Sequence, residues 1–243
     1  MKIAGIIPAR WNSTRFPGKP LALIAGKPLV QHVWEQCQKT SELDRIVIAT
    51  DDGRIVDAAR NFGAEVVLTR ADHPTGTDRL AEVAEQMPEV GALINIQGDE
   101  PLIDPLLVDR LAETLRSNSD LKMVTAASVI REVDALDNPN VVKVVLGANG
   151  DALYFSRSRI PFARDPTATP VTFRHQGIYG YQREFLLQFV RWPQSTLEKI
   201  EQLEQLRALE NGACIHVLIT EHEAQGVDTP EDVAAVERLL LAR

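Results

Sequence analysis

Residues 45–69 read RIVIATDDGRIVDAARNFGAEVVLT, and they contain a strand pattern, a helix pattern and a second strand pattern in succession. Residues 45–50 and 65–69 are short runs rich in β-branched side chains, which favour strands. Between them, residues 52–63 carry apolar side chains at helical spacing and end at Gly63, a residue suited to a helix C-terminus. The stretch therefore predicts a βαβ unit, whose two strands lie parallel in one sheet.

The same alternation extends to both sides of this stretch. Further strands are predicted at 2–7, 92–97 and 123–130, and further helices at 27–38, 77–87 and 104–118. Asp104 followed by Pro105 is a favourable N-cap and first-turn pair for the last of these helices. Repeated βαβ units predict the α/β class, with a Rossmann-like, mostly parallel sheet flanked by helices.

The pattern changes after residue 138. Asn149-Gly150 lies between two β-rich runs and predicts a hairpin. Strands are predicted at 173–181 and 214–220, two helical patterns lie between them, and a terminal helix begins at Pro230. We expect a single domain over residues 1–243, with an antiparallel excursion at about 139–182.

Composition limits the classes of function. The chain has 243 residues, 44% of them hydrophobic, and 26 Lys and Arg against 34 Asp and Glu. The acidic balance argues against binding to nucleic acid or to a membrane surface. The N-terminal apolar run is too short for a signal peptide, and no segment is long enough to span a bilayer, so a cytoplasmic location is expected. Cys37 and Cys214 have no metal-ligand spacing, and we expect both to be buried thiols.

A basic loop follows the first predicted strand. Residues 6–20 read IIPARWNSTRFPGKP and carry Arg10, Arg15 and Lys19, whereas the first acidic residue of the chain is Glu35. Ligands of open parallel sheets bind at the carboxyl ends of strands. Ser13 and Pro20 do not fit a P-loop, and no G-x-G-x-x-G follows the strand. The loop is either a solvated basic patch or a binding loop for a polyphosphate.

Two acidic residues occupy loops expected at the same edge of the sheet. Asp99 follows the strand at 92–97, and Asp228 precedes the terminal helix. Each could be a turn or capping residue. Together with a phosphate loop, however, two carboxylates suit Mg²⁺, which proteins commonly hold by one or two carboxylates plus substrate phosphates.

Motifs along nearly the whole chain resemble one family. STRFPGKPL, HPTGTDR, NIQGDEP, RHQGIYGY and GVDTPED occur in the order found in the 3-deoxy-manno-octulosonate cytidylyltransferases, also called CMP-Kdo synthetases. The resemblance implies a fold of the nucleotide-diphospho-sugar transferase type and a Mg²⁺-dependent nucleotidyltransferase. Its partners would be CTP and the acidic sugar 3-deoxy-manno-octulosonate (Kdo), in lipopolysaccharide biosynthesis. It further implies a homodimer joined through the antiparallel part.

The resemblance also assigns residues. Arg10 and Lys19 would be catalytic through the triphosphate, and Asp99 and Asp228 would bind the metal. The nucleotide would contact Pro8, Ala9, Arg10, Ser13, Arg15, Lys19, Thr75, Gly76, Thr77 and Arg79. The acidic sugar would contact Gln97, Arg157, Arg164, His175, Tyr179, Glu204 and Gln205.

Several of these assignments compete with simpler interpretations. His175 and Tyr179 could lie on the outer face of an antiparallel ribbon. The apolar spacing around Glu204 predicts a helix whose buried stripe is Leu197, Ile200, Leu203, Leu206 and Leu209, which would leave Glu204 solvated. Asp78 replaces a glutamate common in the family, so it is not assigned a role.

Alternatives remain for the function. The acceptor could be a related acid, such as an amino-substituted Kdo or sialic acid, and the nucleotide could differ. A non-catalytic nucleotide-binding protein of the same fold is the other class. No residue is identified as a general base.

Overall fold

The computed structural model describes residues 1–12, 16–165, 167–168, 170–223 and 225–241. Its main feature is a nine-stranded sheet with the order β11-β7-β10-β6-β1-β4-β5, to which β8 and β9 add beside β10. The neighbours β1 and β4, β1 and β6, β4 and β5, and β7 and β11 are parallel, whereas β10 is antiparallel to both β6 and β7. The seven strands of the main path are β1 (Lys2–Ala9), β4 (Arg45–Thr50), β5 (Glu65–Leu68), β6 (Val90–Asn95), β7 (Met123–Val129), β10 (Phe173–Gln182) and β11 (Ile215–Ile219).

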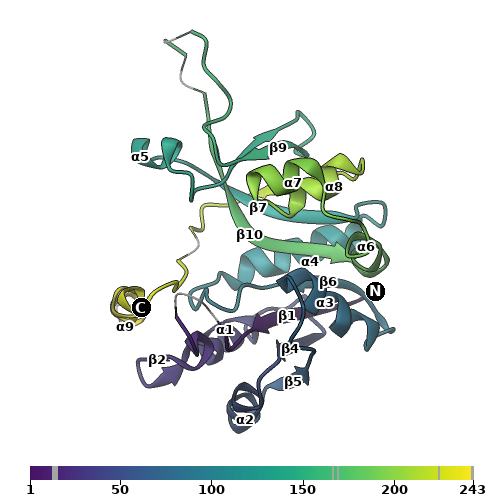
Figure 1. The fold of residues 1–243 in the computed structure, drawn as a ribbon, viewed down its shortest axis with the longest axis vertical. Coiled ribbons are helices and arrows are strands. Elements are labelled where there is room, and N and C mark those ends of the chain that lie inside the picture. Colours follow the sequence, from purple (N-terminus) through teal and green to yellow (C-terminus); the bar gives the residue numbers. More distant parts are fainter. Residues whose placement is uncertain (13–15, 166, 169, 224, 242–243) are drawn as a thin grey trace.

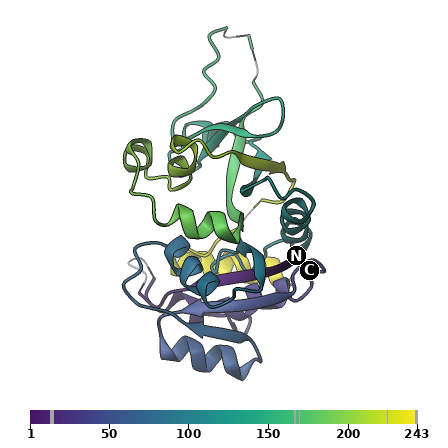
Figure 2. The same cartoon turned by 90° about the vertical axis from the view of Figure 1, so that its right-hand side faces the viewer.

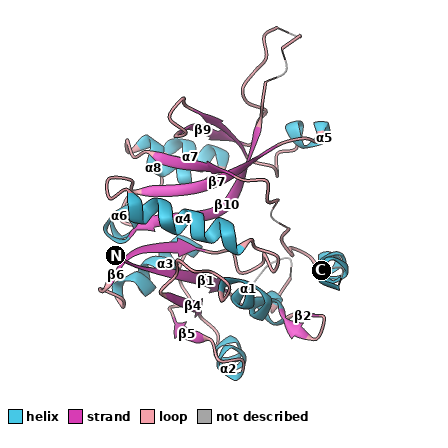
Figure 3. Ribbon diagram, turned by 180° about the vertical axis from the view of Figure 1, so that it is seen from behind, coloured by secondary structure: helices cyan, strands magenta, loops and turns pink. Residues whose placement is uncertain are grey.

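Helices cover both faces of this sheet. One core cluster contains buried side chains of α3 (Gly76–Glu85), α6 (Arg183–Phe189) and α8 (Gln205–Glu210). The other contains those of α1 (Leu29–Cys37), α2 (Gly53–Asn61) and α4 (Pro105–Ser117). Figures 1 and 3 show the sheet from its two sides, with α6 and α8 in front in one view and α4 in front in the other. The predicted α/β class with a mostly parallel, helix-flanked sheet is confirmed.

Local sequence signals locate several element boundaries. Asp104 caps α4 by accepting a hydrogen bond from the Leu106 amide at 3.0 Å, and Pro105 is the first helical residue. Gly63 adopts φ 84° after α2. The predicted hairpin joins β8 (Lys143–Leu146) to β9 (Ala152–Ser156), and Gly150 in its turn has φ 83°.

Other elements do not follow from the pattern. β10 belongs to the antiparallel part of the chain, yet it lies inside the main sheet between β6 and β7. The short elements η1 (Lys19–Leu21), β2 (Leu23–Ile24), β3 (Lys27–Pro28) and α5 (Val133–Asp137) were not predicted. Strand patterns predict that a segment is extended, but they do not predict which strand it pairs with.

The predicted buried stripe around Glu204 is confirmed for Leu203 and Leu206, which are buried, and is wrong for Ile200. Leu197 and Leu209 are partly buried against the same core. The chain forms α7 (Thr196–Glu201) and then α8, separated by Gln202 in a left-handed conformation with φ 53°. Ile200 is consequently 72% exposed. Because the helix breaks at Gln202, residues on its two sides no longer share one helical face.

The expectation for the cysteines holds for only one of them. Cys37 is buried on α1, and burial raises the pKa of its thiol to about 12. Cys214 is exposed directly before β11, so its prediction as a buried thiol is wrong. None of the helices within the described residues is long and apolar enough to cross a bilayer.

The ends of the molecule are formed by a loop and a helix. The loop between β9 and β10 extends well beyond the sheet, and α2 lies at the opposite end (Figures 1 and 2).

The C-terminal helix α9 (Pro230–Leu241) contacts β2, and Val236 of this helix packs with Ile24, Leu29, Leu102 and Val227 in a small third core. This core joins the segment that follows the basic loop to the segment that carries Asp228.

Candidate active site

The carboxyl ends of β1 and β6 form the floor of the site. Because these strands are neighbours and parallel, the residues after them emerge at the same edge of the sheet. A Cβ on Gly98 would lie 2.4 Å from the Pro8 carbonyl oxygen, so only glycine lets the two loops pass this closely. A cavity of about 420 Å³ opens above them, and it is lined by Pro8, Ala9, Arg10, Asn12, Lys19, Pro20, Gln97, Gly98, Asp99 and Asp228.

Lys19 reaches both carboxylates across this cavity. It begins the short helix η1, and the preceding Gly18 has φ 72° and lies against the Trp11 ring. The Lys19 ammonium Nζ lies 2.6 Å from Asp99 Oδ2 and 3.5 Å from Asp228 Oδ1. The Lys19 side chain is 15% exposed, so most of its stem is buried and the charged end is directed into the site.

Asp228 is held next to Asp99 through its backbone. The Val227 amide donates a hydrogen bond to the Asp99 carbonyl at 2.9 Å. The amides of Asp228 and Thr229 donate to Asp232 Oδ2 at 2.9 and 2.8 Å, at the start of α9. No three His, Cys, Asp or Glu side chains of the described residues converge on a metal position. The pair of carboxylates is nevertheless the donor set that Mg²⁺ uses when phosphate oxygens complete its shell.

Arg10 directs an unpaired charge into the same region. Its Nη2 is buried and has no hydrogen-bond partner within the part of the chain that the structure describes. Burial lowers the pKa of Arg10, as does the nearby charge of Arg79, while Asp51, Asp78 and Glu204 oppose the shift. A guanidinium remains charged in proteins, so a buried unpaired donor of this kind indicates an anionic ligand.

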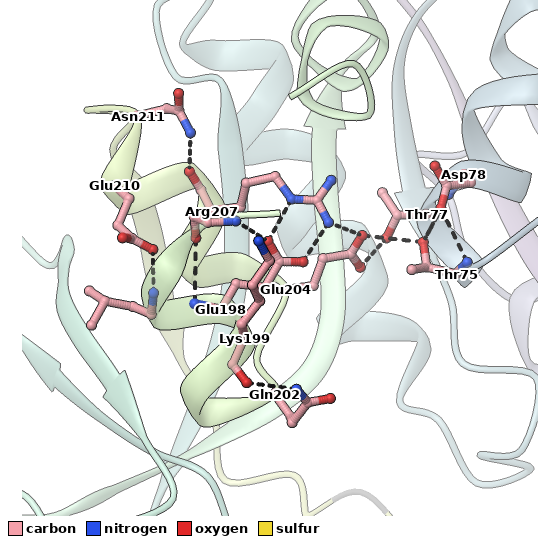
Figure 4. Close-up of polar contacts among 12 residues, drawn as sticks. Thr75, Thr77, Asp78, Glu198, Lys199, Gln202, Glu204, Arg207, Glu210 and Asn211 are labelled. Atoms are coloured by element: carbon pink, nitrogen blue, oxygen red, sulfur yellow. Dashed lines mark hydrogen bonds and ion pairs between the residues drawn. The ribbon is translucent and has the colours of Figure 1, made fainter. Parts of the chain in front are cut away.

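The N-terminus of α3 carries a second polar cluster. Thr75 and Asp78 form a capping box there. The Glu204 carboxylate accepts hydrogen bonds from Thr75 Oγ1 at 3.2 Å and Thr77 Oγ1 at 2.7 Å. Figure 4 shows Glu204 between these threonines and Arg207, so a residue 127 positions further along the chain from Thr77 completes this corner.

A second cavity of about 440 Å³ adjoins the first through Asp228. Its lining includes Glu100, Arg174 and His175. Burial raises the pKa of Glu100 to about 8, with a smaller contribution from Asp99. Between the two cavities, the Gln97 side chain donates to the Gly177 carbonyl at 2.6 Å. The site therefore offers two adjoining compartments with a shared carboxylate.

Comparisons with known proteins agree with this geometry. The cytidylyltransferase family profile matches residues 4–220. A 3-deoxy-manno-octulosonate cytidylyltransferase of Pseudomonas syringae pv. tomato is 54% identical, over 98% of this chain and 97% of its own. The enzyme of the same name from Trichlorobacter lovleyi is 50% identical, over 98% and 99% of the two chains. The chain belongs to the 3-deoxy-manno-octulosonate cytidylyltransferase family.

Solved structures agree on the fold. The structure of a CMP:2-keto-3-deoxy-manno-octonic acid synthetase complexed with CTP superimposes with a TM-score of 0.95 at 40% identity, covering 100% of this chain and 99% of that one. A 4-diphosphocytidyl-2C-methyl-D-erythritol synthase from Anaerococcus prevotii gives a TM-score of 0.66 at 13% identity, covering 99% and 98%, and shares the fold alone. The family match shows that the chain is a nucleotidyltransferase. The solved structures show that it has the fold of that class.

Four of the ten residues expected for the nucleotide line one cavity in this family member. Pro8, Ala9, Arg10 and Lys19 line the first cavity, as do Gln97 and the two expected metal ligands. Thr75, Gly76 and Thr77 lie at the start of α3. Ser13 and Arg15 lie outside the described residues.

Arg79 is the exception among the expected nucleotide contacts. It is fully buried and donates to Asp51 Oδ2 at 2.9 Å and to Thr69 Oγ1. With no exposed surface it does not line the cavity in this conformation. Its charge is close enough to Arg10 to contribute to the lowered pKa of that residue.

Of the residues expected for the sugar, Gln97 lines the first cavity and the other six divide into two groups. His175, Tyr179, Glu204 and Gln205 lie near one another on β10 and around the start of α8, and Gln205 Nε2 is a buried donor with no partner among the described residues. The prediction that Glu204 is solvated, made from pattern alone, is wrong, because its side chain is 29% exposed and accepts the two threonine hydroxyls.

Arg157 and Arg164 form the second group. The Arg157 guanidinium donates to the carbonyls of Glu201 at 2.7 Å, Pro139 at 2.9 Å and Gln202 at 3.3 Å. Its donors are thus used to join the end of α7 to the chain at Pro139. Arg164 is exposed in the long loop between β9 and β10. Neither side chain lines the two cavities described above.

Sequence reasoning did not assign three features of the site. Glu100 lies in the quoted motif NIQGDEP directly after Asp99, and that position could have drawn attention to it. Asp51 directly follows β4, at the same edge as the other site loops, which is a similar signal. The pair of Glu198 and Arg207 gave no such signal, because its members are nine positions apart and lie on two different helices.

Proposed function

We propose that this protein transfers CMP from CTP to the anomeric hydroxyl of Kdo and releases pyrophosphate. The observation that carries the proposal is the Lys19 ammonium between Asp99 and Asp228, at the sheet edge where Arg10 also has an unpaired buried nitrogen. Membership of the family supports CTP and Kdo as the substrates, since relatives about 50% identical over nearly the whole chain carry that activity in their names.

The reaction is a displacement at phosphorus. The anomeric oxygen of Kdo forms a bond to the α-phosphorus of CTP, the bond from that phosphorus to the bridging oxygen breaks, and the hydroxyl proton is released. Reactions of this type need positioning and charge stabilisation more than covalent help from the protein. Arg10 and Lys19 would hold the triphosphate and neutralise the charge that develops on pyrophosphate.

Mg²⁺ fits the carboxylate pair. Both Asp99 and Asp228 already lie within reach of one cation, the Lys19 ammonium, so their oxygens point to a common region. When bound there, Mg²⁺ would withdraw charge from the phosphate oxygens. Lys19 would then turn from the carboxylates to the triphosphate.

The remaining residues supply the two substrate pockets of the proposal. Pro8, Ala9 and the α3 N-terminus with Thr75, Gly76 and Thr77 would enclose the nucleotide, together with Ser13 and Arg15. Gln97, His175, Tyr179, Glu204 and Gln205 would contact the sugar. We retain Arg157 and Arg164 as sugar contacts that require a change of conformation or a neighbouring subunit, and Arg79 as a supporting residue of the nucleotide pocket.

Location and assembly belong to the same proposal. A cytoplasmic enzyme has access to CTP, and Kdo activation would serve lipopolysaccharide biosynthesis. Residues 1–243 would form a single domain, and the antiparallel part at about 139–182 would join two copies in a homodimer.

The test is an assay of the purified protein with CTP, Kdo and Mg²⁺, in which CMP-Kdo is identified by mass spectrometry and pyrophosphate is measured. Lys19→Ala and Asp99→Ala should each reduce kcat by about a hundred- to thousandfold, as expected for loss of an electrostatic contact in the transition state. Lys27→Ala is the matched control, since Lys27 pairs with Glu35 on the surface and should leave the rate unchanged.

A panel of acceptors and nucleotides separates the alternatives. Sialic acid, an amino-substituted Kdo and GTP should give at least tenfold lower kcat/KM than Kdo and CTP. No product with any pair would leave only nucleotide binding, and the proposal would be wrong.

A further inference from the structure

A fully buried ion pair lies behind the sugar side of the site. Arg207 on α8 donates from Nε to Glu198 Oε2 at 2.8 Å and from Nη2 to Glu198 Oε1 at 2.5 Å. Each of these side chains is only 6% exposed. Two parallel hydrogen bonds fix the plane of the guanidinium as well as its distance.

Each member of the pair also contacts a residue of another segment. The Ser195 amide donates to Glu198 Oε2 at 3.0 Å in the capping box of α7. The Arg207 guanidinium lies 4.8 Å from the centre of the Phe189 ring on α6. The pair is therefore braced by three helices, and the guanidinium has little freedom to rotate.

The pair is connected to the site through Glu204. Arg207 Nη2 lies 3.6 Å from Glu204 Oε1, and Glu204 is the member of this group that retains exposed surface, at 29%. On its other side, Glu204 accepts the hydroxyls of Thr75 and Thr77 (Figure 4). Each carboxylate oxygen has a second lone pair, so Glu204 can still accept a hydroxyl from a ligand.

Stability alone is a weak reason for such a pair. The cost of removing two charges from water offsets most of the attraction between them, and apolar residues of similar size can replace a buried pair without loss of stability. Its geometric effect is more specific, because it presents a cation to Glu204 in one fixed orientation.

We propose that Arg207, held by Glu198, is a positioning residue that fixes the Glu204 carboxylate between the α3 N-terminus and the hydroxyl groups of the acceptor acid. The inference rests on the proposed function for the identity of the acceptor. The α3 N-terminus keeps its own cap, since Thr75 Oγ1 accepts from the Asp78 amide at 3.2 Å and the Thr75 amide donates to Asp78 Oδ2 at 3.1 Å. Loss of Arg207 should therefore weaken acceptor binding far more than CTP binding.

A double-mutant cycle tests this role. Arg207→Met should raise the KM for the acceptor by about tenfold or more and change the KM for CTP by less than about threefold, because a displaced contact in a binding site typically costs one to two orders of magnitude. Glu198→Gln, which keeps the shape and the α7 cap, should show the same selectivity with a smaller effect. In a Glu204→Gln background, Arg207→Met should add less than about threefold, since residues that act through one group are not additive.

Phe185→Leu is the control for a purely structural effect. Phe185 packs against the rings of Phe189 and Trp192 rather than against Arg207 or Glu204, so Phe185→Leu should lower Tm without changing the ratio of the two KM values. Equal increases in both KM values, or additive effects of Arg207→Met and Glu204→Gln, would overturn the inference.

A crystal structure of the ligand-free Arg207→Lys protein gives a readout that does not depend on activity. Glu204 should move out of hydrogen-bond distance of Thr77 there, and an unchanged Glu204 position would count against the proposal. A wild-type protein that makes no CMP-Kdo would instead contradict the proposed function, and the position of Glu204 would still decide the role of Arg207.

Discussion

At the scale of single residues, Lys19 and the proposed Mg²⁺ compete for the same two carboxylates. The Lys19 ammonium lies between Asp99 and Asp228, which are also the carboxylates proposed for Mg²⁺. The Lys19 ammonium must therefore leave the two carboxylates before Mg²⁺ can bind both of them. The triphosphate supplies the new partner for the ammonium, so nucleotide and metal should bind better together than separately.

Lys19→Met should tighten the binding of Mn²⁺ to the nucleotide-free protein by about three- to tenfold, because a partly exposed ion pair of this kind is worth on the order of 1 kcal/mol. The same change should weaken CTP binding. Titration calorimetry measures both quantities. Lys27→Met should change neither, and an unaltered Mn²⁺ affinity in Lys19→Met would show that the ammonium does not compete with the metal.

His175 keeps its neutral form to a lower pH than an ordinary histidine does. It packs between Phe155 and Tyr179, with ring centres 5.0 and 5.2 Å away, and its Nε2 lies 3.0 Å from Thr125 Oγ1. Burial lowers the pKa of His175 from 6.5 to about 3. The imidazole should thus contact the sugar as a neutral group.

The depressed pKa also predicts a pH dependence of stability. Above pH 6.5 His175 is neutral in both folded and unfolded chains, and below this value the unfolded chain takes up the proton first. Its contribution is therefore complete above pH 6.5 and is lost progressively as the pH falls toward 3, by about 1.4 kcal/mol for each pH unit.

Urea unfolding at pH 7.5, 6 and 5 should show this loss in the wild type and a shallower decline in His175→Gln. The difference between the two proteins removes the contribution of the carboxylates that both share. Identical slopes would mean that His175 titrates normally in the folded protein.

At the scale of elements, α9 positions a loop of the active site. Asp232 in its first turn accepts the amides of Asp228 and Thr229, and Val236 anchors the helix in the third core with Val227. A helix that looks peripheral in Figure 1 thereby fixes a proposed metal ligand.

Asp232→Ala should lower the free energy of unfolding by about 1 kcal/mol, as for loss of a helix cap, and should raise the Mg²⁺ concentration needed for half-maximal activity severalfold. Asp232→Asn, which keeps an acceptor oxygen, should recover part of both effects. Glu231→Ala is the matched control in the same turn. If Asp232→Ala needed no more Mg²⁺ than the control, α9 would have only a structural role.

Predictability from the sequence also differs between elements. The parallel strands and the helices of the first 130 residues were predictable, because β-branched runs, helical spacing and caps such as Asp104 act locally. Lys19, Asp99 and Asp228 could be grouped because parallel strands place their carboxyl ends at one edge. The position of β10 and the break at Gln202 depend on tertiary packing, so the one-dimensional pattern could not predict that Glu204 contacts Thr77.

At the scale of the whole molecule, the proposed dimer assigns a role to the projecting loop. Phe162 is 88% exposed and Val171 is 61% exposed, and both lie in the long loop between β9 and β10. Exposed apolar side chains on one projecting segment favour burial against another surface. In a dimer this loop would bring Arg164 near a second subunit.

Light scattering at micromolar concentration should give twice the mass of one chain. The double variant Phe162→Asp and Val171→Asp should weaken the dimer by at least about tenfold, because two charges would have to enter an apolar contact. Leu106→Asp, at an equally exposed site on α4, is the control. A wild-type protein with the mass of a single chain would rule out the assembly.

The insertion of β10 between β6 and β7 has a consequence for biosynthesis. β6 and β7 follow each other in the chain, yet the gap between them is filled only by residues 173–182. A ribosome that has released the first 130 residues has supplied β1, β4, β5, β6 and β7, but β6 and β7 each still have an open edge where β10 will pair. Such edges pair readily with other chains, so the interval before β10 emerges is when the nascent protein most needs a chaperone.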